Sequence, residues 1–391
     1  MPINNIKQKR ASGKILHIAS WYPNPWDGVE GNFVRDQIRV FKKELDAETI
    51  VVQVRPSPNR WPRFQVISLD EGARGYFMLA AVKPGKAMEW LSTAFLFFVL
   101  LKERAWRFNC FHFHIAYPLL LHSNLWRWIF RKPILISEHW SAYHYNFYLP
   151  ENSKDIDILR RPFQNGYPVI AVSQALANDI FSFSKRHDFS GFVIPNFVPL
   201  HGARADKNTI PVFFSVNTWR SIKNPMPMLQ GLNRALVDGH HFKLVIGGAG
   251  DMIDKMRSFV GGTALEKCTI FLGKMTKNEI ADQLTKSNGY LFSSDYETFS
   301  VACAEALGAG VPLIGPYIPA IAEYASDQEW VKVDSSDSDG WSAAISRFLR
   351  QWQLGCWDSA IIAERAASRF SEDALRASYI SVMQAIWRDL A

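Results

Sequence analysis

Two glutamates, Glu297 and Glu305, stand eight positions apart within residues 288–315, NGYLFSSDYETFSVACAEALGAGVPLIG. The pattern predicts a short buried strand at 290–292, a polar turn, and then a helix over 298–307. Eight residues of helix advance about 12 Å, so we expect the two carboxylates at opposite ends of one ligand-sized span. Carboxylates accept hydrogen bonds from vicinal hydroxyls, such as those of a sugar ring or a ribose.

The predicted helix opens with Thr298, Phe299 and Ser300. The first backbone N–H groups of a helix have no partner within the helix and lie at the positive end of its dipole, where a phosphate binds readily. We therefore predict a diphosphate at these three residues, with Glu297 facing one part of the ligand and Glu305 another. Isolated helix glutamates would carry no such meaning, and the small residues between these two support the interpretation.

Further polar side chains follow other predicted strands. Arg220 and Lys223 in FFSVNTWRSIKNP lie just past a strand, where two cations could neutralise a leaving diphosphate without a metal. His139 directly follows the strand over 134–137, and a neutral imidazole there could hydrogen-bond a sugar hydroxyl. Surface charge is the alternative for either cation, and a structural role is the alternative for the histidine.

The run ETFSVACAEALGAGVPLIG resembles the signature of two glutamates separated by seven residues in family 4 glycosyltransferases, the group 1 glycosyl transferases of the GT-B fold. The resemblance implies that Glu297 contacts the donor sugar and that Glu305 binds the ribose of the nucleotide. It also places the diphosphate on the backbone amides of Thr298, Phe299 and Ser300.

Other parts of the chain extend this resemblance, which covers about residues 15–316. A glycine-containing loop beside the donor phosphate corresponds to WYPNPWDGVEGN, with Gly31, and a histidine beside the transferred sugar corresponds to His139. The glycine turn near the nucleotide corresponds to Gly248 in LVIGGAGD, whose spacing does not fit a dinucleotide-binding fingerprint. The turn beside the nucleobase is FLGKM, with Lys274 and Met275.

Some matches are looser. The family has four residues between its arginine and lysine, whereas two separate Arg220 and Lys223, and this favours Lys223 as the phosphate ligand. His114, in the strand FHFH with His112, corresponds less specifically to a strand-end histidine of the family. An aromatic cluster could stack on an acceptor sugar or simply pack: Trp140, Tyr143, Tyr145 and Tyr148.

Short apolar, β-branched runs alternate with longer amphipathic segments from residue 14 onward, which is typical of βα units on a parallel sheet. The predicted strands cover 15–19, 49–54, 64–69, 111–115, 134–137, 169–172 and 192–194, and then, after a polar connector, 212–216, 243–246, 269–272, 289–292, 311–314 and 330–333. We expect an α/β protein with two Rossmann-like, doubly wound domains, 14–198 and 209–372, facing across a cleft. The resemblance implies that 373–391 form a helix that crosses back to the first domain.

The composition narrows the class of protein. The 391 residues are 48% hydrophobic, enough for two cores, and the net charge of +7 favours an anionic ligand. The four cysteines have no metal or redox spacing, so we expect reduced thiols in the cytoplasm, and no apolar run reaches the length of a transmembrane helix. The D-x-D spacings at 155–157 and 334–339 fit solvated loops better than a metal site.

We therefore predict a retaining, metal-independent glycosyltransferase that uses a nucleotide diphosphate sugar of the UDP or GDP type, without other cofactor and without a nucleic-acid partner. The predicted acceptor is a glycan or lipid-linked glycan of cell-envelope polysaccharide or lipopolysaccharide synthesis. A nucleotide-sugar epimerase on the same fold and a non-catalytic nucleotide-sugar-binding protein are the alternatives. Basic and aromatic residues at 86–107 and 126–132 suggest peripheral binding to the inner face of an anionic membrane. Residues 90–101, however, are apolar on nearly every side, which favours a buried helix there.

Overall fold

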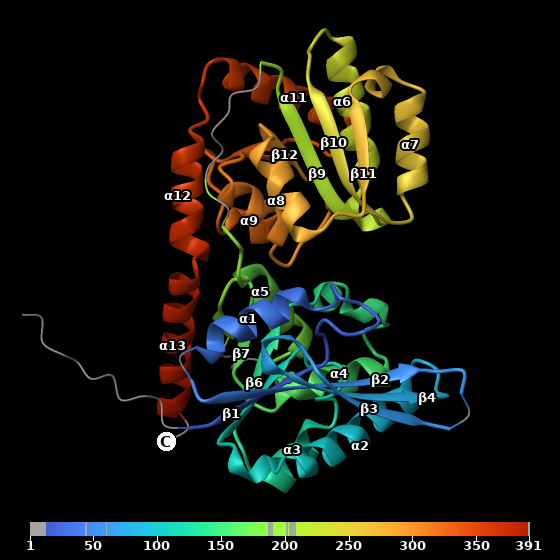
Figure 1. The fold of residues 1–391 in the computed structure, drawn as a ribbon, viewed down its shortest axis with the longest axis vertical. Helices are drawn as coiled ribbons and strands as arrows, with labels where there is room; N and C mark the ends of the chain where they lie inside the picture. Colours follow the sequence, from blue (N-terminus) through green and yellow to red (C-terminus); the bar gives the residue numbers. More distant parts are fainter. Residues whose placement is uncertain are drawn as a thin grey trace, which may run out of the picture. The chain divides into compact units, whose positions relative to one another are not determined.

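The chain forms two compact units, the first built from residues up to 197 together with residues from 375 onward, and the second from residues 198–374 (Figure 1). The computed structural model describes residues 13–43, 45–59, 61–186, 191–200, 202 and 209–389. Each unit has one sheet of mostly parallel strands with helices on its faces, so the predicted α/β class is confirmed.

The first unit has an eight-stranded sheet in the order β3-β4-β2-β1-β5-β6-β7-β8, in which only β3 runs antiparallel to its neighbour. Its strands are β1 (Ile15–Ala19), β2 (Ala47–Pro56), β3 (Arg63–Ser68), β4 (Arg74–Ala80), β5 (Cys110–His114), β6 (Ile134–Glu138), β7 (Val169–Ala171) and β8 (Gly191–Val193). Its helices are α1 (Asn32–Lys42), α2 (Lys86–Lys102), α3 (Ser123–Phe130), α4 (Lys154–Gln164), α5 (Gln174–Ser184) and the last helix, α13 (Glu372–Asp389).

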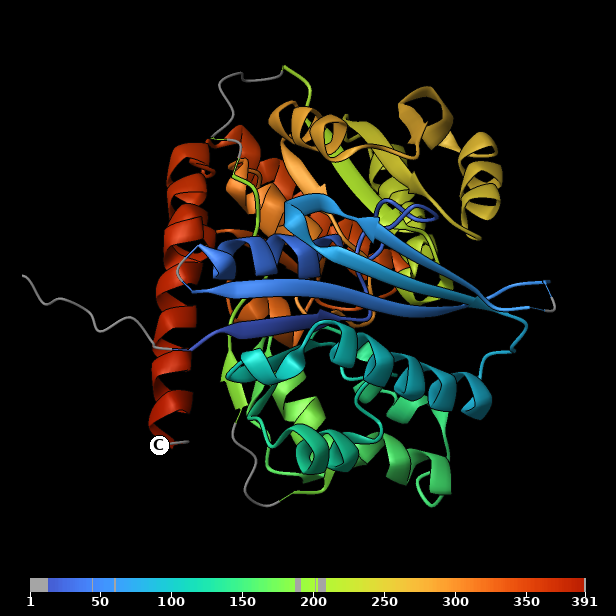
Figure 2. The same ribbon diagram turned by 60° about the horizontal axis from the view of Figure 1, so that its bottom comes forward.

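Helices cover both faces of this sheet, with α1 on one face and α2 and α3 on the other (Figures 1 and 2). Helix α13 belongs to this unit because Leu375, Tyr379 and Met383 are buried in the same core as residues of β1 and β5. The ring of Tyr379 stacks on Phe41 of α1, with 3.4 Å between the ring centroids. The apolar side of the last helix thus completes the core of a unit whose other residues lie far away in the sequence.

The second unit has six strands in the order β11-β10-β9-β12-β13-β14, and all of them are parallel. The strands are β9 (Val212–Thr218), β10 (Lys243–Ala249), β11 (Thr269–Gly273), β12 (Gly289–Leu291), β13 (Leu313–Pro316) and β14 (Trp330–Val333). The helices are α6 (Pro225–Val237), α7 (Ile253–Gly261), α8 (Lys277–Thr285), α9 (Val301–Gly308), α10 (Pro319–Ala322), α11 (Ser338–Gln353) and α12 (Ser359–Phe370). The strand order reverses between β9 and β12, and such a switch point is where doubly wound sheets bind ligands, at the carboxyl ends of the strands.

The strand predictions are close in the second unit and less complete in the first. Strand β4, RGYFMLA, is absent from the prediction, and it pairs with β3 as an antiparallel hairpin at the edge of the sheet. A strictly parallel interpretation has no place for such a pair, because parallel neighbours need a crossover connection whereas these two strands are joined by a short turn. Among the described residues, no helix has both the length and the apolar character needed to cross a bilayer.

Candidate active site

A partly buried ion pair joins the two loops that flank the switch point of the second unit. Lys223 ends a short 3-10 helix after β9, and Glu297 lies in the turn after β12. Lys223 Nζ donates to Glu297 Oε1 at 2.6 Å, and the same oxygen accepts a hydrogen bond from Ser294 Oγ at 2.7 Å. The two charged side chains are only 19% and 17% exposed, so the pair is held in place yet reachable from solvent.

Short hydrogen bonds connect the backbones of these two loops. Asp295 N donates to Ile222 O at 3.1 Å, and Ser293 Oγ donates to Lys223 O at 2.5 Å. Asn224 Nδ2 donates to Asp295 Oδ1 at 3.0 Å. The predicted polar turn is therefore present, but its serines and aspartate position Lys223 against Glu297, a role that the sequence analysis did not assign to them.

The prediction of a helix beginning at Thr298 is wrong, because α9 begins at Val301. Ser300 precedes it in the left-handed region, with φ at 65°, and Phe299 is 2% exposed. The Phe299 ring packs against Tyr324 and Phe370, so its burial in the core holds residues 298–300 out of the helix. The helical amide groups next to Glu297 therefore belong to residues after Ser300.

The side chain of Tyr324 secures this irregular segment. Its hydroxyl lies 2.9 Å from Phe299 O and 3.1 Å from Ser300 O. Glu297 and Glu305 consequently do not lie on one continuous helix, as the spacing argument assumed, because only Glu305 is in α9. Cys303, Ala304 and Ala306 of α9 are fully buried, and Glu305 is half-buried among them. Small residues let α9 pack closely here, as expected.

The predicted nucleotide-side residues follow neighbouring strands of the same sheet. Gly248 is the residue before the last of β10, with φ at 97°, and a Cβ there would lie 1.9 Å from Asn217 O, so only glycine fits. Met275 follows β11, and its sulfur would lie 2.3 Å from a Cβ at Gly247. Lys274 is exposed. Because the strands are parallel, these residues share one edge of the sheet with Lys223 and Glu297.

Arg220 lies only three positions before Lys223, but its side chain has a different environment. Its side chain is exposed, and the described residues include no ion pair with it. The guanidinium is therefore available to an anion, but nothing in the second unit holds it in one orientation, whereas Lys223 is positioned by Glu297.

In the first unit, Gly31 begins α1 where a side chain cannot be accommodated. Its φ is 62°, and a Cβ would lie 2.5 Å from the carbonyl carbon of Trp21. The loop before it is held by Asn24 Nδ2, which donates to Glu30 Oε2 at 2.6 Å, and by an ion pair between Arg55 and Glu30. The backbone thus approaches closely at the first βα turn, as the residue type predicts.

His139 follows β6 and is 6% exposed. Its Nδ1 lies 3.1 Å from Asn196 Oδ1, and its ring is 4.8 Å from that of Phe33 in the first turn of α1. Burial lowers the pKa of His139 to about 3, so the imidazole is neutral at physiological pH. Asn196 orients this ring from a segment 57 residues later, a contact that no local sequence pattern indicates.

Glu138, directly before His139, is a buried carboxyl group with two hydrogen-bond donors. Its Oε1 accepts from Ala116 N and from the hydroxyl of Tyr143, both at 2.7 Å. Burial raises the pKa of Glu138 to about 7, although the hydrogen bonds oppose the shift. Tyr143 is 2% exposed, so this member of the predicted aromatic cluster packs inside the unit, whereas Tyr148 is 77% exposed.

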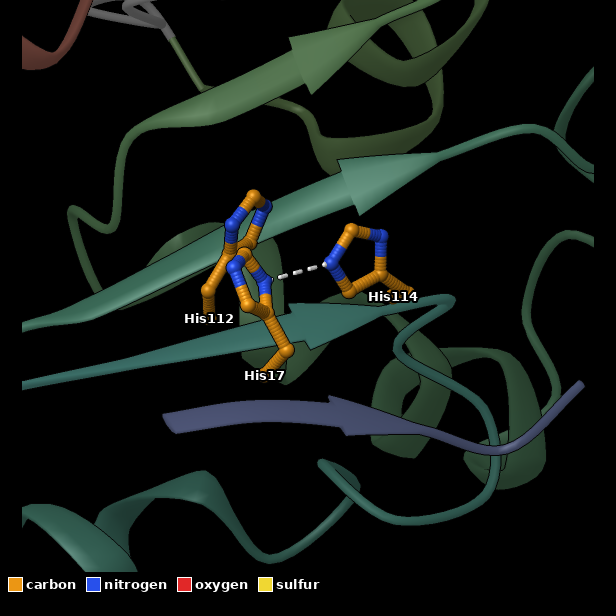
Figure 3. A group of neighbouring side chains, drawn as sticks. All are labelled: His17, His112 and His114. Carbon is orange, nitrogen blue, oxygen red and sulfur yellow. Dashed lines mark hydrogen bonds between the residues drawn. The ribbon is translucent and has the colours of Figure 1, made fainter. Parts of the chain in front are cut away.

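Three histidines lie side by side on β1 and β5 (Figure 3). His17, His112 and His114 are fully buried, and each places a ring nitrogen within 4.8 Å of the others. Among the described residues, this is the group whose ligand atoms lie close enough together to hold a metal ion. Hydrogen bonds already engage these rings: His17 Nδ1 lies 3.0 Å from His114 Nε2, and His112 lies 2.8 Å from Ser137 Oγ and 3.3 Å from the Tyr379 hydroxyl.

The same burial keeps the three rings uncharged. It lowers the pKa of His17 to about 3 and the pKa values of His112 and His114 well below the usual value. Both nitrogens of His112 have partners, and all three side chains are fully buried, so we interpret the group as a packing cluster beneath the strand ends.

Comparison with known proteins identifies the second unit. Residues 201–364 match the family described as glycosyl transferases group 1. This part of the chain is a group 1 glycosyltransferase domain. An uncharacterized glycosyltransferase of Methanocaldococcus jannaschii is 26% identical over 120 residues, and the match spans 30% of this chain and 30% of that relative.

Solved structures agree with the fold of the whole chain. Sucrose-phosphate synthase from Thermosynechococcus elongatus superimposes with a TM-score of 0.75 at 15% identity, covering 96% of this chain and 100% of the other. Anabaena HepE in complex with UDP superimposes with a TM-score of 0.71 at 13% identity, covering 95% and 100%. Both likenesses show the GT-B fold. The group 1 domain supplies Lys223, Glu297 and Glu305, and the predicted roles of individual residues stay predictions.

Proposed function

We propose that the protein transfers a glycosyl group from a nucleotide diphosphate sugar to an acceptor hydroxyl. The observation that carries the proposal is the Lys223–Glu297 pair at the switch point of a group 1 glycosyltransferase domain. In the reaction, the bond between the anomeric carbon and the diphosphate breaks, and the nucleoside diphosphate leaves with the electron pair. The acceptor oxygen bonds to the anomeric carbon, and its hydroxyl proton passes to the leaving diphosphate.

The cations at this edge of the sheet support a reaction without a metal. Negative charge grows on the leaving diphosphate, and a preorganised ammonium group stabilises that charge because it needs no reorientation during the reaction. Lys223 has this property, since Glu297 and the loop contacts hold it, and Arg220 adds a second, mobile charge. Glu297 then serves two roles, holding Lys223 and accepting a sugar hydroxyl with its second oxygen.

The finer parts of the proposal concern the donor and the acceptor. We favour a UDP sugar, because the fold is that of a protein solved in complex with UDP. Glu305 accepts hydrogen bonds from the ribose, and the turn at Lys274 and Met275 contacts the base. The acceptor is a glycan, in the lipid-linked form used for envelope polysaccharides, and transfer proceeds with retention at the cytoplasmic face of the membrane.

Thermal-shift measurements with UDP, GDP and ADP sugars test the donor class, because a bound ligand raises apparent stability by mass action. We expect the largest shift with a UDP sugar, followed by release of UDP when an acceptor mixture is added. Mass spectrometry of the sugar product distinguishes transfer from epimerisation, since an epimerase needs no acceptor. Absence of both binding and turnover with every donor would contradict the proposal.

Two isosteric variants separate the roles of the glutamates. Glu305→Gln should weaken UDP binding roughly tenfold, because the amide accepts ribose hydrogen bonds less strongly than a carboxylate does. Glu297→Gln should keep UDP binding and lower turnover, because its partners are Lys223 and the sugar. Calorimetry with free UDP and steady-state kinetics measure the two effects, and an equal loss of UDP affinity in both variants would overturn this division.

A further inference from the structure

The outer side of α2 is apolar along its whole length. Its exposed positions at helical spacing are Ala87, Trp90, Ala94, Phe98 and Leu101, and the side chains of Trp90 and Phe98 are 61% and 66% exposed. A surface helix normally presents polar residues to water on this side. The sequence analysis favoured a buried helix over 90–101, and the structure corrects this, because only one side of α2 packs on the sheet.

An apolar groove lies beside this helix face. Phe64 and Val66 of the edge strand β3 form one wall, Phe95 and Phe98 of α2 form the other, and Lys102 lies at the rim. The volume of the groove is about 380 Å³. Phe64 and Val66 are themselves more than half exposed. We call the exposed apolar residues of α2 together with this groove the α2 face.

The charges around the α2 face are mostly basic. Lys83 precedes α2, Lys102 ends it, and Arg104 follows, and all three side chains are exposed. The acidic residues of the same segment are engaged elsewhere, because Glu89 accepts a hydrogen bond from Tyr117 and the buried Glu103 pairs with Arg74.

Lys86, at the start of α2, pairs with Asp155 at 2.7 Å, so it contributes less free positive charge. The free basic groups therefore gather at Lys102 and Arg104, next to the groove. A surface with aromatic and aliphatic residues bordered by lysine and arginine fits the interface of an anionic bilayer, where apolar groups enter the acyl region and cations contact phosphate.

We propose that the α2 face docks on an anionic phospholipid bilayer, with Trp90 and Phe98 in the acyl boundary and Lys102 and Arg104 on the head groups. The groove between β3 and α2 accepts part of one acyl chain, since its lining is almost wholly apolar. Docking does not depend on the transfer activity proposed above, whereas its use, access to a lipid-linked acceptor, rests on that activity.

Co-sedimentation with vesicles of phosphatidylglycerol and phosphatidylcholine tests the docking, with pure phosphatidylcholine vesicles as the reference. The wild-type chain should pellet with the anionic vesicles at low salt and return to the supernatant as salt is added. Trp90→Ser with Phe98→Ser should lower the partition coefficient at least about tenfold, because two aromatic side chains no longer enter the bilayer. Lys102→Glu with Arg104→Glu should lower it at least about 20-fold at low salt.

Matched variants in the second unit control for general effects. Val237→Ser with Leu354→Ser removes two exposed apolar side chains, and Lys255→Glu with Lys267→Glu makes the same change in net charge. Both controls should keep wild-type partitioning. UDP binding should stay unchanged in all four double variants, which separates loss of docking from loss of the proposed donor site.

Two results would overturn the proposal. If the wild-type protein stays in the supernatant with anionic vesicles at low salt, bilayer docking is excluded. The α2 face would then be tested as a protein interface, by measuring whether Trp90→Ser with Phe98→Ser changes the oligomeric state. Equal loss of binding in the Lys255→Glu, Lys267→Glu control would assign any membrane affinity to overall charge and not to this face.

Discussion

The polar residues at the strand ends of the two units differ in their exposure to solvent and in their electrostatic environment. In the second unit, the loops beyond β9 and β12 present Lys223 and Glu297, which are about one-fifth exposed and form an ion pair with each other. In the first unit, the residues at the end of β6 are buried, and burial disfavours their charged forms, because it raises the pKa of Glu138 to about 7 and lowers that of His139 to about 3. Charge is thus presented where a diphosphate is expected, and neutral polar groups where the sugar is expected.

The contrast has a packing origin. The loops after β9 and β12 hold each other by hydrogen bonds and leave the charged tips at the surface. The ends of β5 and β6 are covered by α1, by the segment around Tyr143 and by Asn196, so Glu138 and His139 lose contact with water and form hydrogen bonds to Tyr143 and Asn196. An ion pair therefore holds the strand-end residues of the second unit, whereas buried hydrogen bonds hold those of the first. We expect the two units to respond differently to pH and to mutation.

The largest expected difference is in acid stability. The pKa values of His17 and His139 are lowered to about 3, and those of His112 and His114 are also lowered, so below pH 6.5 the unfolded chain binds protons that the folded unit excludes. Stability is therefore complete above pH 6.5 and is lost as the pH falls toward 3. His17 and His139 each remove about 2 kcal/mol between pH 6.5 and 5, and His112 and His114 act in the same direction.

Hydrogen exchange followed by mass spectrometry can measure this for each unit, with intrinsic exchange rates corrected for pH. Between pH 7 and 5, peptides of the first unit should lose protection while those of the second, whose described histidines, His240 and His241, are not buried, keep theirs. His17→Phe should reduce the loss by about 2 kcal/mol, since one protonation no longer favours unfolding. Equal loss in both units would remove the contrast.

A second expected effect concerns the charged site. Lys223→Ala should reduce kcat/KM by about 2 to 4 kcal/mol of transition-state stabilisation, because a fixed cation no longer meets the leaving phosphate. Arg220→Ala should cost less, because its mobile side chain loses more entropy on binding. Steady-state kinetics with a saturating acceptor gives both values, and Lys255→Ala serves as the control for a lost surface charge. A larger loss for Arg220→Ala would reverse the assignment.

The neutral site makes a third prediction. If the imidazole contacts the sugar, as proposed, and the second unit binds the nucleotide, His139→Ala should lower kcat about a hundredfold while UDP affinity stays unchanged. Asn196→Ala should have a smaller effect, about tenfold, since it only orients the ring. Calorimetry with UDP and turnover measurements distinguish these outcomes, and wild-type turnover in His139→Ala would make this residue purely structural.

The smallest effect is expected at Glu138. Its folded pKa of about 7 lies above the unfolded value, so its contribution to stability is complete at low pH and is lost as the pH rises toward and past 7, opposite in sign to that of the histidines. Glu138→Gln mimics the protonated carboxyl group. The wild-type free energy of unfolding should therefore fall by about 1 to 2 kcal/mol more than that of the variant between pH 5.5 and 7.5. Thermal unfolding across this range measures it, and identical pH profiles would show that Glu138 stays ionised.

Much of the fold follows from local pattern. Five of the six strands of the second unit consist almost wholly of apolar residues, as is typical of parallel sheets covered by helices, and all six predictions overlap the observed elements. The sequence also places Lys223 and Glu297 in loops that follow apolar runs, and Gly248 near the end of such a run. In these places the local preference and the tertiary environment agree.

Other features were decided by contacts between distant residues. The start of α9 moved to Val301 because Phe299 is buried against Tyr324 and Phe370, which helix propensity cannot anticipate. The neighbour of His139 is Asn196, and the hairpin partner of β3 is the unpredicted β4. Each depends on which side chains meet after the chain has folded.

The sequence by itself determined the fold class, the two alternating halves and the identity of the charged residues at the strand ends, because periodic burial and residue type are local properties. Only the tertiary structure decided which side of α2 faces water, which histidines are neutral, and which glutamate pairs with Lys223. Solvent exposure and pKa depend on the surroundings of a group, and those surroundings are assembled from segments that lie far apart in the chain.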